Sequence, residues 1–310
     1  MIPFRTKIKP KKGSNQIDYT SKILLIGSCF TENIGDKLKH FKFTNNVNPF
    51  GILFHPKAIE NLIVASLTNK VYTEKDLVFY NERWHCFDAH SVISNTNKET
   101  VLSNLNNIVT DTKAYLKSAS HIIITLGTAW VYNHLASDNL VANCHKIPQK
   151  EFHKKILSVN EIVQSLAKSI QLIKEVNSKA TIIFTVSPVR HLKDGFIENT
   201  QSKAHLIAAI HQVNENYFPS YEIMLDDLRD YRFYKKDMLH PNETAIDYIW
   251  EKFSKNWINE ASNHLMKEVN QIQKGLSHKP FNATSEQHQC FLRDLQIRID
   301  ELEMAFGITF

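Results

Sequence analysis

The sequence predicts an α/β protein with a doubly wound, flavodoxin-like parallel sheet of five strands and helices on both faces. Short apolar runs of strand length alternate along the chain with longer stretches whose apolar residues recur at helical spacing. Such alternation is typical of parallel sheets that are covered on both sides. At 310 residues and 43% hydrophobic content, the chain is long enough to bury one large core of this kind.

Five apolar runs are the strand candidates, and the amphipathic stretches between them are the helix candidates. The clearest helix begins at Ser158, whose hydroxyl can cap free backbone N–H groups while Glu161 reaches back to complete a capping box. Apolar residues then follow at helical spacing up to Ile173. The strand candidates are, in chain order, residues 23–26, 41–47, 122–126, 181–186 and 221–225.

The chain divides into an N-terminal arm (1–20), an α/β domain (21–258) and a C-terminal helical extension (259–310). Within the domain, residues 69–120 interrupt the alternation and predict a hairpin or cap followed by a helix, inserted beside the site. The extension has helically spaced apolar residues and is interrupted at residues 275–280. We expect it either to pack on the core or to mediate homo-oligomerisation.

Composition excludes several classes of function. The formal charge of +5 is spread over a lysine-rich surface, and without interleaved aromatic and basic residues we expect no nucleic-acid partner. No signal peptide and no apolar run long enough for a membrane span is visible, so we expect a cytoplasmic protein. The four cysteines are far apart, and the fifteen histidines form no His-x-x-x-His pair with a nearby acid. We therefore expect reduced thiols, no metal and no cofactor.

Two distant segments carry the residues that could perform chemistry. Late in the chain, Asp237 precedes His240 by three residues in a turn that opens a helix at Pro241, a spacing that lets the acid orient the imidazole. Early in the chain, an apolar strand runs directly into Gly27-Ser28-Cys29. Because the carboxyl ends of parallel strands share one edge of a sheet, we expect these segments to meet there.

Together these segments resemble the SGNH (GDSL-type) hydrolases, whose first block reads strand-Gly-Asp-Ser-Leu-Thr and whose last reads Asp-x-x-His-Pro. The run Gly27-Ser28-Cys29-Phe30 is similar to the signature of the GSCFA family, a largely uncharacterised bacterial branch of that superfamily, although its usual final Ala is Thr31 here. The resemblance extends over about residues 20–255 and includes three further runs, at residues 143–146, 187–189 and 230–234.

The resemblance implies a nucleophile, a base and an acid. Aligned without a gap, Cys29 falls on the catalytic serine of the superfamily and Ser28 on its aspartate, with Ser28 as the alternative nucleophile if the strand ends one residue earlier. We expect the helix N-terminus and a neighbouring imidazole to lower the pKa of the Cys29 thiol. His240 would act as general base and Asp237 would hold its tautomer. The alternative is structural, with Cys29 packed at a tight joint and His240 at a helix start.

The superfamily also implies three donors to an oxyanion: the N–H of the nucleophile, a glycine and an asparagine side chain. Gly51 is the candidate glycine, and the run Gly127-Thr128-Ala129 matches the Gly-x-Asn block. Ala129 cannot donate from its side chain, so another group must replace the asparagine. The candidate substitutes are Trp130, Asn143 and His145, the last two in a loop that we expect near the cleft.

Two functions remain open on the sequence. The first is an SGNH-like hydrolase of ester or thioester bonds, or an acyltransferase, acting on a small-molecule or glycan ester. The second is a non-catalytic protein that binds a ligand or glycan on a degenerate SGNH scaffold.

Overall fold

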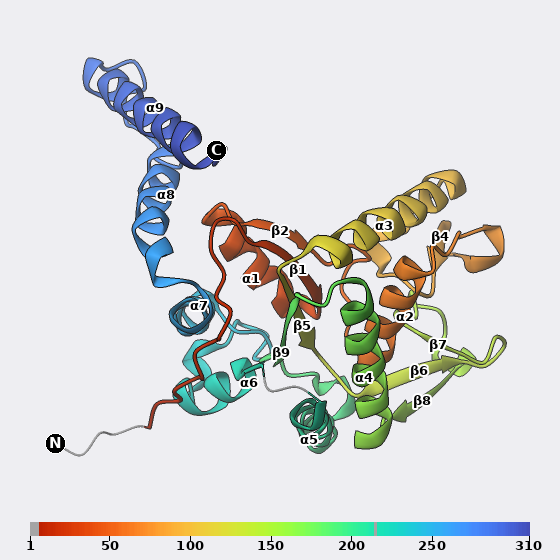
Figure 1. The fold of residues 1–310 in the computed structure, drawn as a ribbon. Coiled ribbons are helices and arrows are strands. Elements are labelled where there is room, and N and C mark those ends of the chain that lie inside the picture. Colours follow the sequence, from red (N-terminus) through yellow and green to blue (C-terminus); the bar gives the residue numbers. More distant parts are fainter. Residues whose placement is uncertain (1–5, 214–215) are drawn as a thin grey trace.

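A computed structural model describes residues 6–213 and 216–310; residues 1–5 of the predicted arm lie outside the described residues. Its centre is a five-stranded, all-parallel sheet with the strand order β10-β9-β5-β1-β2, as the sequence predicted (Figure 1). The order reverses beside β1, which creates the crevice at which doubly wound proteins bind ligands. The strands are β1 (Lys22–Gly27), β2 (Thr44–Val47), β5 (His121–Leu126), β9 (Thr181–Val186) and β10 (Tyr217–Phe218).

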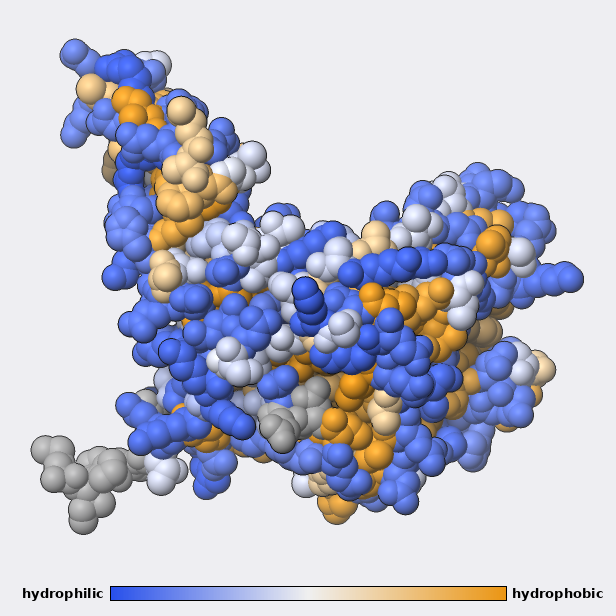
Figure 2. All heavy atoms as spheres, viewed as in Figure 1, coloured by the Kyte–Doolittle hydropathy of each residue, from blue (hydrophilic) through white to orange (hydrophobic). Residues whose placement is uncertain are grey.

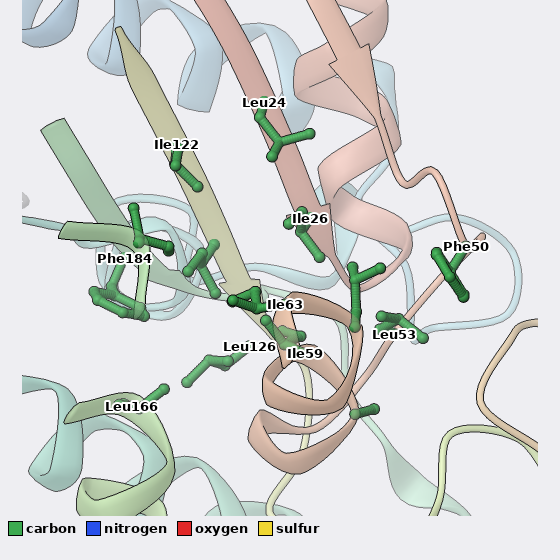
Figure 3. Packing of buried hydrophobic residues seen from close by; sticks show 14 of the residues in the cluster. Leu24, Ile26, Phe50, Leu53, Ile59, Ile63, Ile122, Leu126, Leu166 and Phe184 are labelled. Atoms are coloured by element: carbon green, nitrogen blue, oxygen red, sulfur yellow. The ribbon is translucent and has the colours of Figure 1, made fainter. Parts of the chain in front are cut away.

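Helices cover both faces of this sheet, and alternate strand residues point into two separate hydrophobic cores. On one face, strand residues such as Leu24, Ile122 and Phe184 pack against α2 and α4 (Figure 3), and α3 and α5 complete the layer. On the other face, Ile23 and Ile123 pack against α1 and α7. These helices are α1 (Cys29–His40), α2 (Pro56–Leu67), α3 (Lys98–Ser118), α4 (Val159–Val176), α5 (Phe196–Val213) and α7 (Glu243–Trp257).

The predicted fifth strand is wrong in position. Residues 221–225 lie in α6 (Ser220–Glu222) and the π-helical turn Ile223–Asp227 that follows it, and the strand is the two-residue β10 just before Pro219. A short apolar run suits a buried strand and a buried helical turn equally well. Here Ile223 and Met224 belong to a helical turn, and their side chains are buried in the core.

Two small antiparallel sheets flank the main one. The predicted hairpin is present as β3 (Leu77–Tyr80) and β4 (Arg83–Cys86). The second sheet was not predicted; it has three strands in the order β7-β6-β8 and follows β5 in the chain. Its strands are β6 (Trp130–His134), β7 (Asn139–Val141) and β8 (Phe152–Ile156).

The two ends of the chain differ in how they contact the domain. The N-terminal segment lies along α7, where Ile17 exchanges backbone hydrogen bonds with Trp257 (2.7 Å) and Asn259 (2.8 Å). The C-terminal helices α8 (Asn263–Leu276) and α9 (Glu286–Phe306) form a pair that projects from the α7 side of the molecule (Figure 1). We call this pair the C-terminal arm.

Candidate active site

The junction between β1 and α1 fixes the two nucleophile candidates. Gly27 has φ 148°, and a Cβ at this position would lie 2.1 Å from the carbonyl oxygen of Thr125 on β5, so only glycine fits. Ser28 is the N-cap of α1 and is fully buried, whereas Cys29, the first residue of the helix, is partly exposed. Of the two candidates, Cys29 is therefore the one that reaches solvent.

The structure reverses the expected direction of the thiol pKa. Burial, followed by the charge of Glu32, raises the pKa of Cys29 above its ordinary value. Lys203 and the backbone N–H groups of Cys29 and Phe30 act in the opposite direction and offset the rise in part. The helix N-terminus thus favours the thiolate, as expected, but desolvation is the larger effect. A base must remove the proton of this thiol before it can react near neutral pH.

Lys203, on α5, is the principal site residue that the sequence reading missed. Its ammonium nitrogen donates to the carbonyl oxygens of Gly127 (2.7 Å) and Ser187 (2.8 Å), which follow the ends of β5 and β9. The residue is 1% exposed, and desolvation lowers its pKa to about 7. A lysine on the core-facing side of an amphipathic helix was the available signal; the buried residues of α5 are Asn199, Ser202, Lys203, Leu206, Ala209 and Ile210.

The Asp237–His240 pair is formed as its spacing predicted. Nδ1 of His240 lies 2.7 Å from Oδ2 of Asp237, and the other carboxylate oxygen accepts the backbone N–H groups of Leu239 (2.9 Å) and His240 (3.0 Å). These hydrogen bonds lower the pKa of Asp237 to about 2. Met238, between the two, adopts φ 59°, and the N–H of Arg190 donates to the carbonyl of Leu239 (3.1 Å). The loop that carries the pair is thereby attached to the loop after β9.

His191 links the pair to the buried lysine. Burial, then the charges of Lys203 and His240, lower the pKa of His191 to about 3. Its ring packs edge-on against Phe54, with 5.5 Å between centroids. The charges of Lys203 and His240 both act on His191, and that of Lys203 also acts on Cys29. Within residues 6–213 and 216–310, no hydrogen bond joins Cys29 to His240. In ligand-free active sites, the hydrogen bond between nucleophile and base often forms only when substrate binds.

Two of the predicted oxyanion donors already have internal acceptors. The N–H of Gly51 donates to the carbonyl of Asn48 (2.7 Å), and that of Gly127 donates to the carbonyl of Phe54 (2.8 Å). Gly127 nevertheless adjoins Ser28, the residue before Cys29, because a Cβ there would lie 3.2 Å from the Cβ of Ser28.

Trp130 is similarly engaged. Its indole N–H donates to the carbonyl of Glu198 (3.3 Å), while the backbone N–H of Ala129 donates to the hydroxyl of Ser202 (2.7 Å). The backbone N–H of Cys29 differs from these donors, because the first N–H groups of a helix have no intrahelical acceptor. Of the predicted oxyanion donors, the backbone N–H of Cys29 is the one that still points towards the Cys29 sulfur.

Asn143 and His145 lie in the expected loop, where their polar groups are engaged by Cys86 and Ser91. Nε2 of His145 lies 2.7 Å from the carbonyl oxygen of Cys86, and Nδ1 lies 3.0 Å from the hydroxyl of Ser91. The backbone N–H of His145 donates to Oδ1 of Asn143 (2.8 Å). Desolvation lowers its pKa to about 4, which keeps the ring neutral. These contacts attach the loop to the segment after the β3–β4 hairpin.

In residues 6–213 and 216–310, no three His, Cys, Asp or Glu side chains lie in a position to share a metal ion. Over the same ranges, no helix has the length and apolar character that crossing a membrane requires.

The fold and site define a doubly wound α/β protein with a partly exposed cysteine at the start of the first helix and a histidine oriented by an aspartate in the loop before α7. The chain belongs to the GSCFA family, whose model matches residues 22–253. A second model, the C-terminal domain of GSCFA domain proteins, matches residues 269–307 in the arm. A comparison with curated proteins finds no match.

Proposed function

We propose that this chain is an SGNH-like acyl hydrolase or acyltransferase that forms an acyl-enzyme at Cys29. His240 takes the thiol proton while the sulfur attacks the acyl carbonyl, and it returns this proton to the departing alcohol or thiol. Water or a second acceptor then attacks the acyl-enzyme and regenerates the thiol. Asp237 fixes the tautomer of His240 and stabilises its cationic form.

One observation carries this proposal: the 2.7 Å hydrogen bond between Asp237 and His240, in a loop attached by Arg190 to the end of β9. A carboxylate that accepts two backbone N–H groups and one imidazole is held rigidly, so the ring it orients is also held. The raised pKa of Cys29 adds a reason for a nearby base, because the resting thiol is protonated.

The substrate class follows from the reaction type. A sulfur nucleophile supported by one backbone N–H donor is best matched to activated acyl groups. We therefore propose that the substrate is an ester or thioester of a small molecule or glycan, and that the reaction takes place in the cytoplasm. Transfer and hydrolysis share the same first half-reaction and differ only in the acceptor.

Acyl transfer to the protein from an activated thioester or nitrophenyl ester tests the proposal. We expect intact-protein mass spectrometry to detect one acyl group on Cys29, and steady hydrolysis to fall at least about 100-fold in Cys29→Ala and His240→Ala. Cys290→Ala is the matched thiol control, because Cys290 is exposed on the arm, and it should behave like the parent. Parent-level hydrolysis by both site variants, with the fold intact, would refute the triad.

The occupied donors at Gly51, Gly127 and Trp130 favour a second candidate, a non-catalytic binding protein. A site without oxyanion donors can still hold an ester in the crevice without cleaving it. Saturable binding of a glycan ester, combined with no acylation and no change on Cys29→Ala, would favour this alternative.

A further inference from the structure

Helix α9 carries two apolar faces. One face packs on α8: Leu295 and Ile299 are buried against Ile272, and Gly275 admits the Leu295 side chain closely. Leu295 and Ile299 are the only buried residues that the structure describes in this helix of 21 residues. Because a helix gains most of its stability in proteins from burying a face, α9 is poorly supported by α8 alone.

The second face is a stripe that we call the outer stripe. At 100° per residue it lies within about 40° of the direction of Ile297, whereas Leu295 and Ile299 point about 160° away. Ile297 is 56% exposed and Met304 89% exposed. Between residues 290 and 304 of α9, the outer stripe consists of Cys290, Arg293, Ile297, Glu301 and Met304.

The stripe is open to solvent, and its charges have no opposite-charge partner in the part of the chain that the structure describes. Figure 1 shows most of α9 projecting beyond the domain, and Figure 2 shows apolar surface on the arm among hydrophilic residues. Neither Arg293 nor Glu301 forms an ion pair within residues 6–213 and 216–310; Arg293 contacts only the sulfur of Cys290, at 3.4 Å. Arg298, on the other side of the helix, is by contrast paired with Glu268 of α8 (2.7 Å).

The order of residues in the stripe is symmetric about its centre. Arg293 and Glu301 lie at equal distances on either side of Ile297, and so do Cys290 and Met304. If two copies of α9 are placed antiparallel with Ile297 on a two-fold axis, Arg293 of each meets Glu301 of the other. Cys290 then meets Met304, and Ile297 meets itself. A two-fold interface requires this kind of self-complementary surface.

We propose that the C-terminal arm is a homodimerisation element in which α9 pairs antiparallel with α9 of a second copy of this chain, centred on Ile297. A parallel pair would set Arg293 against Arg293 and Glu301 against Glu301, which like-charge repulsion disfavours. A different protein as partner would have no need of the symmetry about Ile297. Two exposed aspartates flank the stripe: Asp300 lies on the same edge as Arg293 of the other copy, which is attractive, and Asp294 on the same edge as Glu301, where screening makes the repulsion small.

The expected interface is modest. A helix of this length is about 31 Å long and offers three apolar layers and two symmetric ion pairs. We therefore expect a concentration-dependent dimer, and one whose affinity falls as salt is raised.

Charge reversal in the full-length chain tests the pairing by sedimentation velocity over a range of protein concentrations. We expect Arg293→Glu alone and Glu301→Arg alone each to weaken the dimer at least tenfold. The double variant should return the dissociation constant to within about threefold of the parent, because the two charges exchange places. Glu303→Arg is the matched control: it makes the same charge change about 120° from the stripe, and it should leave dimerisation unchanged.

Disulfide trapping tests the orientation. Met304→Cys, combined with the native Cys290, should give under mild oxidation an intermolecular bond that joins residue 290 to residue 304 in peptide mapping. A bond joining 304 to 304 would overturn the antiparallel arrangement. A parent chain that stays monomeric at all concentrations, or a double charge reversal that restores nothing while circular dichroism shows a folded arm, would overturn the proposal itself.

Discussion

The ammonium of Lys203 lies 2.7 Å from the carbonyl oxygen of Gly127, which places a buried cation directly beneath the strand end that adjoins Ser28 and Cys29. A second bond, to Ser187, ties the same ammonium to the end of β9. One side chain from α5 therefore holds together two of the strand ends around which the site is built. It also supplies positive charge where a thiolate would form.

Lys203 should make the stability of the fold depend on pH. Burial lowers its pKa to about 7, from about 10.4 in the unfolded chain, so above pH 7 the unfolded state binds more protons than the folded state. Stability from this group therefore increases as the pH rises from 7 towards 10, and the cost of burying the charge is greatest below pH 7. Relative to Lys203→Met, the parent should gain about 2 to 3 kcal/mol between pH 7 and 9.

Urea unfolding of the two proteins at pH 6.5, 7, 8 and 9 measures this difference. The other titrating groups are common to both proteins and cancel. Parallel stability curves would show that the amine of Lys203 does not titrate near neutrality.

Replacing Asp237 by Asn tests whether the carboxylate orients His240. The carboxylate of Asp237 accepts the Nδ1 proton of His240 on one oxygen and two backbone N–H groups on the other. An asparagine amide has only one accepting oxygen, so the imidazole of His240 loses its fixed tautomer. We expect kcat on an activated ester to fall about 100-fold or more, with KM nearly unchanged. A fall in stability without a loss of kcat would instead assign Asp237 to the turn alone.

Trp130→Phe separates packing from chemistry. The ring stays under the Lys154 ammonium, 4.5 Å from its centroid, but the bond from the indole N–H to Glu198 is lost. We expect a loss of about 0.5 to 1.5 kcal/mol in the free energy of unfolding, with activity within twofold of the parent. A role as oxyanion donor would instead lower kcat about 100-fold, so parallel thermal and kinetic measurements distinguish the two.

The centre of the main sheet could be predicted because β1, β5 and β9 are buried on both faces and give nearly continuous apolar runs. The three-stranded sheet of residues 130–156 could not be predicted in this way. Its strands are short and half-exposed, and in β8 only Phe152 is buried and two consecutive lysines interrupt any apolar pattern. Residues 221–225 show the converse, an apolar run that satisfied the strand pattern but folds as a helical turn.

Within the site, contacts between residues close in sequence could be predicted, whereas contacts between distant residues could not. Asp237 and His240 are three residues apart, so their hydrogen bond is nearly a local property of the sequence. The bonds of Lys203 to Gly127 and Ser187 depend instead on how α5 packs across the strand ends, over separations of 76 and 16 residues. The thiol pKa was likewise wrong in direction because the sequence showed the helix N-terminus but not the depth of burial of Cys29.

Gly27→Ala should damage the site through the fold. An alanine Cβ at this position would lie 2.1 Å from the backbone oxygen of Thr125, and φ 148° is strained for any residue with a Cβ, so β1 or β5 must shift. We expect a loss of about 3 kcal/mol or more in the free energy of unfolding, together with slower acylation of the neighbouring Cys29. Gly307→Ala is the matched control, because Gly307 also has a positive φ, 65°, but has nothing within 4 Å of the added methyl. Gly307→Ala should lower the free energy of unfolding by only about 1 kcal/mol, because it introduces backbone strain but no steric clash.

The free energies of unfolding of the two variants are measured from urea midpoints. Equal losses would show that the contact between Gly27 and Thr125 is not the constraint that sets the β1–α1 junction.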